Sequence, residues 1–143
     1  MPRVATGIVN PDGTLLRKIP TPQPKKLPVP KKVLDYLRSA LADVPTEGTA
    51  HGAFTDFPFD KVHIAGKTGT AEVYGKKDTA WFASFAPANN PRFAVVAMIT
   101  DAGTGGGYAA PAVREIYEAI YGLTGKPAAL PDGKLPKPPK VLR

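Results

Sequence analysis

The chain has 143 residues, of which 43% are hydrophobic, so it is long enough for one compact domain with a buried core. Its formal net charge is +7, and it contains no cysteine, which excludes a disulfide framework, a cysteine metal site and a cysteine nucleophile. No apolar run approaches the length of a membrane span, and no export signal is visible at the start.

The positive charge is concentrated in the two flanks of the chain. Residues 1–32 hold seven Lys or Arg against one acidic residue, and residues 126–143 hold five against one, whereas residues 33–125 hold seven against ten. Both flanks alternate lysine with proline, which is typical of extended, solvated segments. We therefore expect an N-terminal hairpin and connector at 1–32, a folded part at 33–125 and a disordered Pro/Lys-rich tail at 126–143. Because the basic residues lie outside the folded part, we expect no nucleic-acid partner.

The first third of the chain predicts a hairpin followed by a helix. Strand-like runs at 3–9 and 14–19 flank Asn10-Pro11-Asp12-Gly13, where proline in second place and glycine in fourth favour a type I turn. After a proline-rich connector at 20–30, helical spacing of apolar residues predicts a helix over about 31–44, ended by Pro45. The loop at 45–61 carries three phenylalanines that we expect to attach it to the body, namely Phe54, Phe57 and Phe59.

The remainder predicts an antiparallel meander and a second helix, which gives an α+β fold. Strands are expected at about 62–74, 79–86 and 92–100, joined by short turns. In the second strand, Trp81 shares one face with Ala83, and Phe82 shares the other with Ser84. The third is apolar on both faces, so we expect a cover on each, either from helix 31–44 or from an upstream part of the protein. A flexible glycine-rich loop at 101–107 and a helix over about 111–122 complete the fold.

The stretch from Ile64 to Glu72 carries the candidate chemistry. In a strand, Thr68 and Thr70 point to one face and Lys67 and Gly69 to the other, and the glycines permit close approach by a backbone or ligand. The stretch is not a phosphate-binding loop, because it lacks the first glycine of that motif and no helix follows. Two interpretations remain, a binding edge for an elongated ligand and a solvated edge strand whose lysine discourages aggregation.

Lys67-Thr68-Gly69 is one of three short signatures shared by penicillin-binding proteins and serine β-lactamases. The chain matches more than this tripeptide, because over about residues 2–123 it resembles the C-terminal part of the transpeptidase domain of a class B penicillin-binding protein. The matching stretches, in the family's order, are Val9 to Gly13, Gly48 to Ala50, Ala65 to Glu72, Asp78 to Pro87, and Ala109 to Pro111.

The resemblance implies acyl-transfer chemistry. Family members attack a D-alanyl-D-alanine stem peptide with a serine and pass the acyl group to an amine, and β-lactams acylate the same serine. The resemblance makes Lys67 the catalytic cation that stabilises the substrate carboxylate. It makes Thr68, Gly69 and Thr70 substrate-binding residues, with the backbone N–H of Thr70 as an oxyanion-hole donor. No metal or cofactor is implied.

The two serine motifs of the family, Ser-x-x-Lys and Ser-x-Asn, do not occur in these 143 residues. Ser39 is followed three residues later by Ala42, and Ser84 by Pro87, and neither has the required Asn. The resemblance thus implies an incomplete transpeptidase fold that supplies the Lys-Thr-Gly wall but no nucleophile, and that is inactive alone. It implies an upstream part of the same protein and a stem peptide or β-lactam as partners. It also implies the extracytoplasmic face of the bacterial cell membrane as the location.

The residues by themselves leave a second function open. A stand-alone, non-catalytic module could use the Lys67 strand edge to hold a peptide or a cell-wall polymer. Such a module predicts a monodisperse monomer that unfolds cooperatively, whereas a fragment with an exposed apolar surface predicts aggregation.

Overall fold

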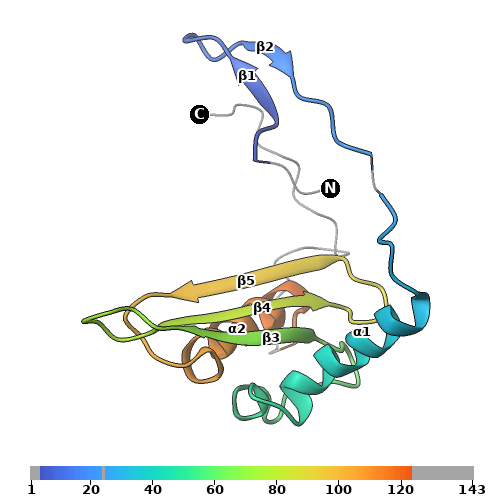
Figure 1. The fold of residues 1–143 in the computed structure, drawn as a ribbon, viewed down its shortest axis with the longest axis vertical. Coiled ribbons are helices and arrows are strands. Elements are labelled where there is room, and N and C mark those ends of the chain that lie inside the picture. Colours follow the sequence, from blue (N-terminus) through green and yellow to red (C-terminus); the bar gives the residue numbers. More distant parts are fainter. Residues whose placement is uncertain (1–3, 24, 124–143) are drawn as a thin grey trace. The chain divides into compact units, whose positions relative to one another are not determined.

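The computed structural model describes residues 4–23 and 25–123, so the predicted tail at 126–143 lies outside the described residues. The chain divides into two compact units, of which the first ends at Val29 and the second begins at Pro30. The first unit contains an antiparallel hairpin of β1 (Gly7–Val9) and β2 (Leu15–Lys18) (Figure 1). The amide of Gly13 donates to the carbonyl of Asn10 across its turn at 2.9 Å, and Gly13 has a φ of 84°. The predicted hairpin is confirmed, with shorter strands.

The second unit is built on a three-stranded antiparallel sheet of order β3-β4-β5 (Figure 1). Its strands are β3 (Ala65–Ala71), β4 (Thr79–Ala86) and β5 (Phe93–Ile99). The predicted α+β fold with a meander is confirmed. β3 is shorter than the predicted span of 62–74, because its pairing with β4 runs only from Ala65 opposite Phe85 to Ala71 opposite Thr79.

One face of the sheet is covered by α2 (Ala110–Tyr121), which contacts β4 and β5 (Figure 1). Phe82 of the sheet and Tyr117 of the helix are both fully buried in this layer. The Ser84 hydroxyl donates to the carbonyl of Val95 at 2.8 Å and lies 3.1 Å from the Tyr117 hydroxyl. The predicted alternation along β4 is confirmed, since Phe82 and Ser84 are buried whereas Trp81 is exposed.

The loop before β3 is attached to the core through aromatic contacts, as predicted. It begins with the short helix η1 (His51–Phe54), and the ring of Phe54 lies 5.9 Å from that of Phe82. The side chain of Arg114 on α2 fixes the same loop by donating to the carbonyls of Ala53 at 3.1 Å and Thr55 at 2.6 Å. These contacts hold the segment before β3 close to the sheet.

The first helix of this unit, α1 (Lys31–Thr46), is longer and less buried than predicted. The predicted end at Pro45 is wrong, because a proline removes only its own N–H and the last turn tolerates that loss. The amide of Glu47, beyond the proline, still donates to the carbonyl of Asp43 at 2.8 Å. Within the predicted apolar stripe, Leu37 is 48% exposed, so the stripe packs only in part.

The second face of β5 is open in the described part of the chain. Of the two covers that the sequence left open, the helix at 31–44 does not supply this one, and an upstream part of the protein stays a prediction. α1 contacts β3 and η1 instead, and β5 is an edge strand of the sheet. Val96 and Met98 on this face are 59% and 53% exposed. β5 therefore has one packed face and one apolar face without a cover among the described residues.

The glycine-rich stretch after β5 is helical in part, and the prediction of a flexible loop over all of 101–107 is wrong. It forms η2 (Gly105–Ala109), a single π-helical turn that continues directly into α2. The amide of Gly107 donates to the Thr104 hydroxyl at 3.3 Å at the start of this turn. Pro111 lies in the first turn of α2 and Gly122, with a φ of 65°, follows its end, so the predicted helix over about 111–122 is confirmed.

Candidate functional site

All four residues that the sequence singled out lie consecutively on β3, at an edge of the sheet within the described part of the chain. Lys67 and Thr70 are exposed, whereas Thr68 and Gly69 are half-buried. An edge strand presents unpaired backbone N–H and C=O groups along its outer side. The four residues thus form a short strip that joins a charge, two hydroxyls and backbone groups.

The register of the sheet assigns these side chains to opposite faces, as predicted. Lys67 is opposite Ala83, on the open face, and Thr68 is opposite Phe82, on the face covered by α2. Because one ligand cannot reach both faces through the sheet, only the outer edge of β3 gives access to the ammonium group and the hydroxyls together. A ligand that uses both must therefore be elongated and lie along this edge.

The ammonium group of Lys67 is held at the strand without an acidic partner. Its Nζ donates to the carbonyl of Thr68 at 2.7 Å, and no salt bridge among residues 4–23 and 25–123 involves it. A lysine side chain with no carboxylate beside it is suited to attract an anionic group. This arrangement is compatible with both interpretations, a binding edge and a lysine that protects an edge strand.

Thr49, which the sequence matched to the family without assigning it a role, contacts the candidate site. Its hydroxyl oxygen lies 2.6 Å from the hydroxyl oxygen of Thr68, although the two residues are 19 positions apart. Thr49 follows the end of α1, and its contact with β3 depends on how that helix packs against the strand. No local pattern in the sequence indicates such a contact.

The two glycines of the strip before and after Lys67-Thr68 have different environments. A Cβ on Gly69 would meet only the side chain of Trp81, at 3.2 Å, whereas a Cβ on Gly105 would lie 2.5 Å from the Gly69 carbonyl oxygen and 2.9 Å from its nitrogen. A Cβ on Gly66 would instead meet the ring of Phe82 and the carbonyl of Ala83, both at 2.8 Å. η2 therefore packs directly against the strand that carries the site.

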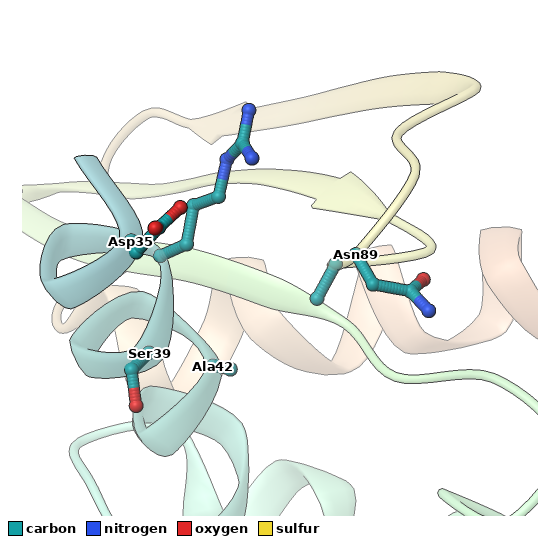
Figure 2. A pocket seen from close by; sticks show the side chains of 6 residues that line it. Asp35, Ser39, Ala42 and Asn89 are labelled. Atoms are coloured by element: carbon teal, nitrogen blue, oxygen red, sulfur yellow. The ribbon is translucent and has the colours of Figure 1, made fainter. Parts of the chain in front are cut away.

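A pocket of about 350 Å³ lies elsewhere, between α1 and the turn that follows β4 (Figure 2). Its lining residues are Asp35, Arg38, Ser39, Ala42, Ala88 and Asn89. Figure 2 shows Asn89 across from the helix that carries Asp35 and Ser39. None of these residues belongs to β3, and Asp35 is already paired with Lys31. We therefore locate the candidate site at the edge of β3 and not in this pocket.

Other kinds of site find little support in the described residues. No group of three or more His, Asp or Glu side chains comes together there in a way that would hold a metal ion. Within the same residues, no helix has the length and the apolar character needed to cross a bilayer.

Comparison with known proteins identifies the family. The family model of the penicillin-binding protein transpeptidase domain matches residues 1–118. The chain belongs to this family. The resemblance drawn from the Lys-Thr-Gly strand and its flanking stretches is thereby confirmed.

Three relatives illustrate the similarity. The peptidoglycan D,D-transpeptidase MrdA of Haemophilus influenzae is 34% identical over 50% of this chain and 13% of that protein. The solved structure of Pseudomonas aeruginosa PBP2 is 34% identical, with a TM-score of 0.60, over 75% of this chain and 23% of that one. The imipenem acyl-enzyme of penicillin-binding protein A from Mycobacterium tuberculosis is 28% identical, with a TM-score of 0.55, over 79% and 24%. The chain thus spans about a quarter or less of each.

Proposed function

We propose that this chain is the C-terminal part of a D,D-transpeptidase that cross-links peptidoglycan by acyl transfer from D-Ala-D-Ala stem peptides. In this proposal the chain supplies the Lys-Thr-Gly wall of the active site but no nucleophile. One observation carries the proposal: Lys67 is exposed and has no salt bridge in the described chain, and it lies beside Thr68 on an edge strand of a transpeptidase family member.

The residues of β3 suit an acyl-transfer reaction. The charge of Lys67 would stabilise the carboxylate at the end of the stem peptide, and the hydroxyls of Thr68 and Thr70 would donate to it. The backbone N–H of Thr70 would donate to the oxygen that becomes negatively charged when the acyl carbonyl is attacked. Loss of one such donor typically costs roughly 2.7–4 kcal/mol of transition-state stabilisation.

Neither serine of the chain is placed to attack a substrate at this edge. Ser84 is only 6% exposed, and its hydroxyl is bonded within the core to the carbonyl of Val95. Ser39 lies on α1 and lines the separate pocket of Figure 2. A serine with a Ser-x-x-Lys partner, supplied by an upstream part of the same protein, would complete the site.

The open face of the sheet supports the same upstream partner. Trp81 on β4, next to the strand that carries Lys67, is 37% exposed on this face, and Val96 and Met98 on the following strand β5 are 59% and 53% exposed. A contiguous apolar face of this kind is typical of an interface. The upstream part would cover this face and bring the nucleophile to the edge of β3. Such a protein would act at the extracytoplasmic face of the bacterial cell membrane and bind β-lactams.

Labelling with a fluorescent penicillin tests this function. We expect the isolated chain to form no covalent adduct on a denaturing gel. The same chain, expressed behind the serine-bearing segment that we expect its gene to encode upstream, should form one. Lys67→Ala in the longer protein should slow labelling by about 10- to 100-fold, the usual weight of a hydrogen bond to a charged group. An adduct on the isolated chain, or no Ser-x-x-Lys in the upstream reading frame, would contradict the proposal.

A stand-alone module that binds peptide or cell-wall polymer at the Lys67 edge is the second candidate. The chain's own core favours it, since Ile64, Phe82 and Tyr117 are fully buried without help from another chain. Calorimetric titration of the isolated chain with a D-Ala-D-Ala stem peptide separates the two. Measurable affinity from a monodisperse monomer supports the module, whereas self-association without affinity supports the transpeptidase fragment.

A further inference from the structure

We propose that Thr49 is a positioning residue of the transpeptidase site, which orients the hydroxyl of Thr68 toward the substrate carboxylate. In this proposal Gly106 keeps Thr49 in place by having no side chain. The inference rests on the proposed function, because it assigns a new role within the same site.

The distance between the two hydroxyls defines what they can do. The oxygens of Thr49 and Thr68 are 2.6 Å apart, within the range of a strong O–H···O hydrogen bond. A threonine hydroxyl has one proton to donate, and a carboxylate can only accept. If Thr68 donates its proton to the substrate carboxylate, the proton between the two threonines must come from Thr49. Thr49 then donates to Thr68, and Thr68 donates to the carboxylate.

Such a chain of donors strengthens the terminal bond, because each hydroxyl polarises the next. It also fixes the side-chain rotamer of Thr68 before the substrate arrives, so less conformational freedom is lost on binding. The opposite direction, with Thr68 donating to Thr49, would occupy the proton that the carboxylate needs. The two directions predict opposite effects on binding of the carboxylate when the Thr49 hydroxyl is removed: weaker binding if Thr49 donates to Thr68, and unchanged or tighter binding if Thr68 donates to Thr49.

The backbone around Thr49 is held by hydrogen bonds on both sides. The amide of Ala50 donates to the carbonyl of Val44 in α1 at 3.1 Å, and the amide of His51 donates to the carbonyl of Gly48 at 3.0 Å. The Thr49 hydroxyl therefore projects from a fixed segment at the end of α1, and the hydroxyl pair joins that segment to β3.

η2 packs against both partners. A Cβ on Gly106 would lie 2.2 Å from the Thr49 carbonyl oxygen and 4.0 Å from Cγ2 of Thr68. A Cβ on the preceding Gly105 would lie 2.2 Å from the Trp81 carbonyl oxygen, next to its close approach to Gly69. Unlike Gly103, whose φ is 131°, neither Gly105 nor Gly106 has a left-handed φ. Positions 105 and 106 therefore need glycine because a side chain there would have no space, and the neighbouring segments that carry Thr49 and Thr68 limit that space.

The first test compares Thr49→Val with Thr49→Ser in the longer protein that contains this chain and its nucleophile. Thr49→Val removes the hydroxyl at nearly constant shape. We expect it to raise the penicillin concentration for half-maximal acylation rate by about five- to tenfold, with little change in the limiting rate, as for the loss of one hydrogen bond. Thr49→Ser keeps the hydroxyl and should remain within about twofold of the wild type. Unchanged or tighter binding by Thr49→Val would overturn the proposal.

The second test uses glycine substitutions. Gly106→Ala must displace the Thr49 carbonyl and should weaken penicillin binding at least as much as Thr49→Val. Gly52→Ala is the matched control, because a Cβ at Gly52 meets no atom within 4 Å. It should leave binding unchanged. Equal behaviour of the two alanine variants would show that Gly106 has no positioning role.

A readout on the 143-residue chain itself separates this inference from the proposed function. Three-bond NMR couplings of Cγ2 of Thr68 to its backbone nitrogen and carbonyl carbon report the χ1 rotamer. One rotamer is expected in the wild type and in Thr49→Ser, and rotamer averaging in Thr49→Val. If the longer protein is not acylated by penicillin, the proposed function fails, whereas the couplings still decide whether Thr49 positions Thr68. Averaging in the wild type would overturn the inference.

Discussion

The two faces of the β3-β4-β5 sheet differ in what covers them, although both are apolar. On one face, Phe82 lies fully buried beneath Tyr117 and its neighbours on α2. On the other, Trp81 is 37% exposed and Met98 is 53% exposed, with no helix over them in the described part of the chain. The same alternating strands thus have one face that is buried under a helix and one face whose apolar side chains are exposed in the described part of the chain.

This difference separates what holds the chain together from what the proposed site needs. Phe82 shares the face of Thr68, so the covered layer supports the hydroxyls of the site from below. Lys67 shares the open face with Ala83 and Val96, so its surroundings depend on whatever covers that face. Substitutions on the covered face should therefore change the stability of the isolated chain, and those on the open face should mainly change its association.

The largest effect is expected from Phe82→Ala. The side chain is fully buried, and its loss leaves a cavity under the sheet, so the free energy of unfolding should fall by about 3–5 kcal/mol. Trp81→Ala, one residue away on the open face, should cost only roughly 1–2 kcal/mol, since part of its surface is already in water. Urea denaturation followed by circular dichroism measures both. Equal losses would show that the two faces are equally packed.

A smaller effect distinguishes two tyrosines of α2. Tyr117→Phe removes the hydroxyl that lies 3.1 Å from Ser84, and should cost about 1 kcal/mol. Tyr121→Phe removes a buried hydroxyl that has no hydrogen-bond partner among the described residues, so it should be neutral or stabilising. The difference in urea midpoint between the variants measures this contrast. A larger loss for Tyr121→Phe would show that its hydroxyl has a partner.

The burial of the Tyr117 hydroxyl should also make the stability of the fold depend on pH in the alkaline range. Burial raises the pKa of Tyr117 to about 12 from an ordinary value of 10.0, against the opposing effect of its hydrogen bond to Ser84. Between these values the unfolded chain has already lost a proton that the folded chain keeps, so stability falls as the pH rises from about 10 to 12. The urea midpoint of Tyr117→Phe should fall less steeply over this window. Parallel slopes for wild type and variant would contradict the assignment.

The sequence was sufficient to predict the features that follow local periodicity. Alternation along β4 placed Phe82 and Trp81 on opposite faces, because neighbouring side chains in a strand must diverge. The candidate roles of Lys67 and Thr68 come from a short signature whose residues are adjacent in the chain, and they stay predictions. The residues that make up each signal lie within a few positions of one another in the chain, so neither prediction requires knowledge of how distant segments pack.

Features that depend on packing between distant segments were missed. η2 forms in a run of glycines that has no periodic pattern, so the sequence gives no sign of it. Its position depends on packing, because only residues without a side chain fit at 105 and 106, against Gly69 and the Thr49 carbonyl. The Thr49–Thr68 contact depends on the position of α1. The sequence left two covers open for the second face of β5, because an apolar pattern shows that a strand suits a cover without showing which segment provides it. The structure excludes helix 31–44 in this role among the described residues, and the upstream cover stays a prediction.

The smallest effect on stability, and the clearest on association, is expected on the open face itself. Replacing Val96 and Met98 together by lysine puts two charges on this face, where both side chains are already more than half exposed, at 59% and 53%. The free energy of unfolding should change by less than about 0.5 kcal/mol for each, as is usual at exposed positions. Self-association of the isolated chain should nevertheless decrease, because the apolar patch that drives it is interrupted.

Sedimentation velocity at increasing protein concentration measures this association. Tyr36→Lys on α1 serves as the control, because Tyr36 is 73% exposed but lies outside the sheet. It should leave the association unchanged. If the chain carrying Val96→Lys and Met98→Lys associates as strongly as the wild type, contact occurs elsewhere, and the open face is not the surface that a missing layer would cover. If association falls in the double lysine variant and not in Tyr36→Lys, the face that carries Lys67 is the surface through which the isolated chain associates.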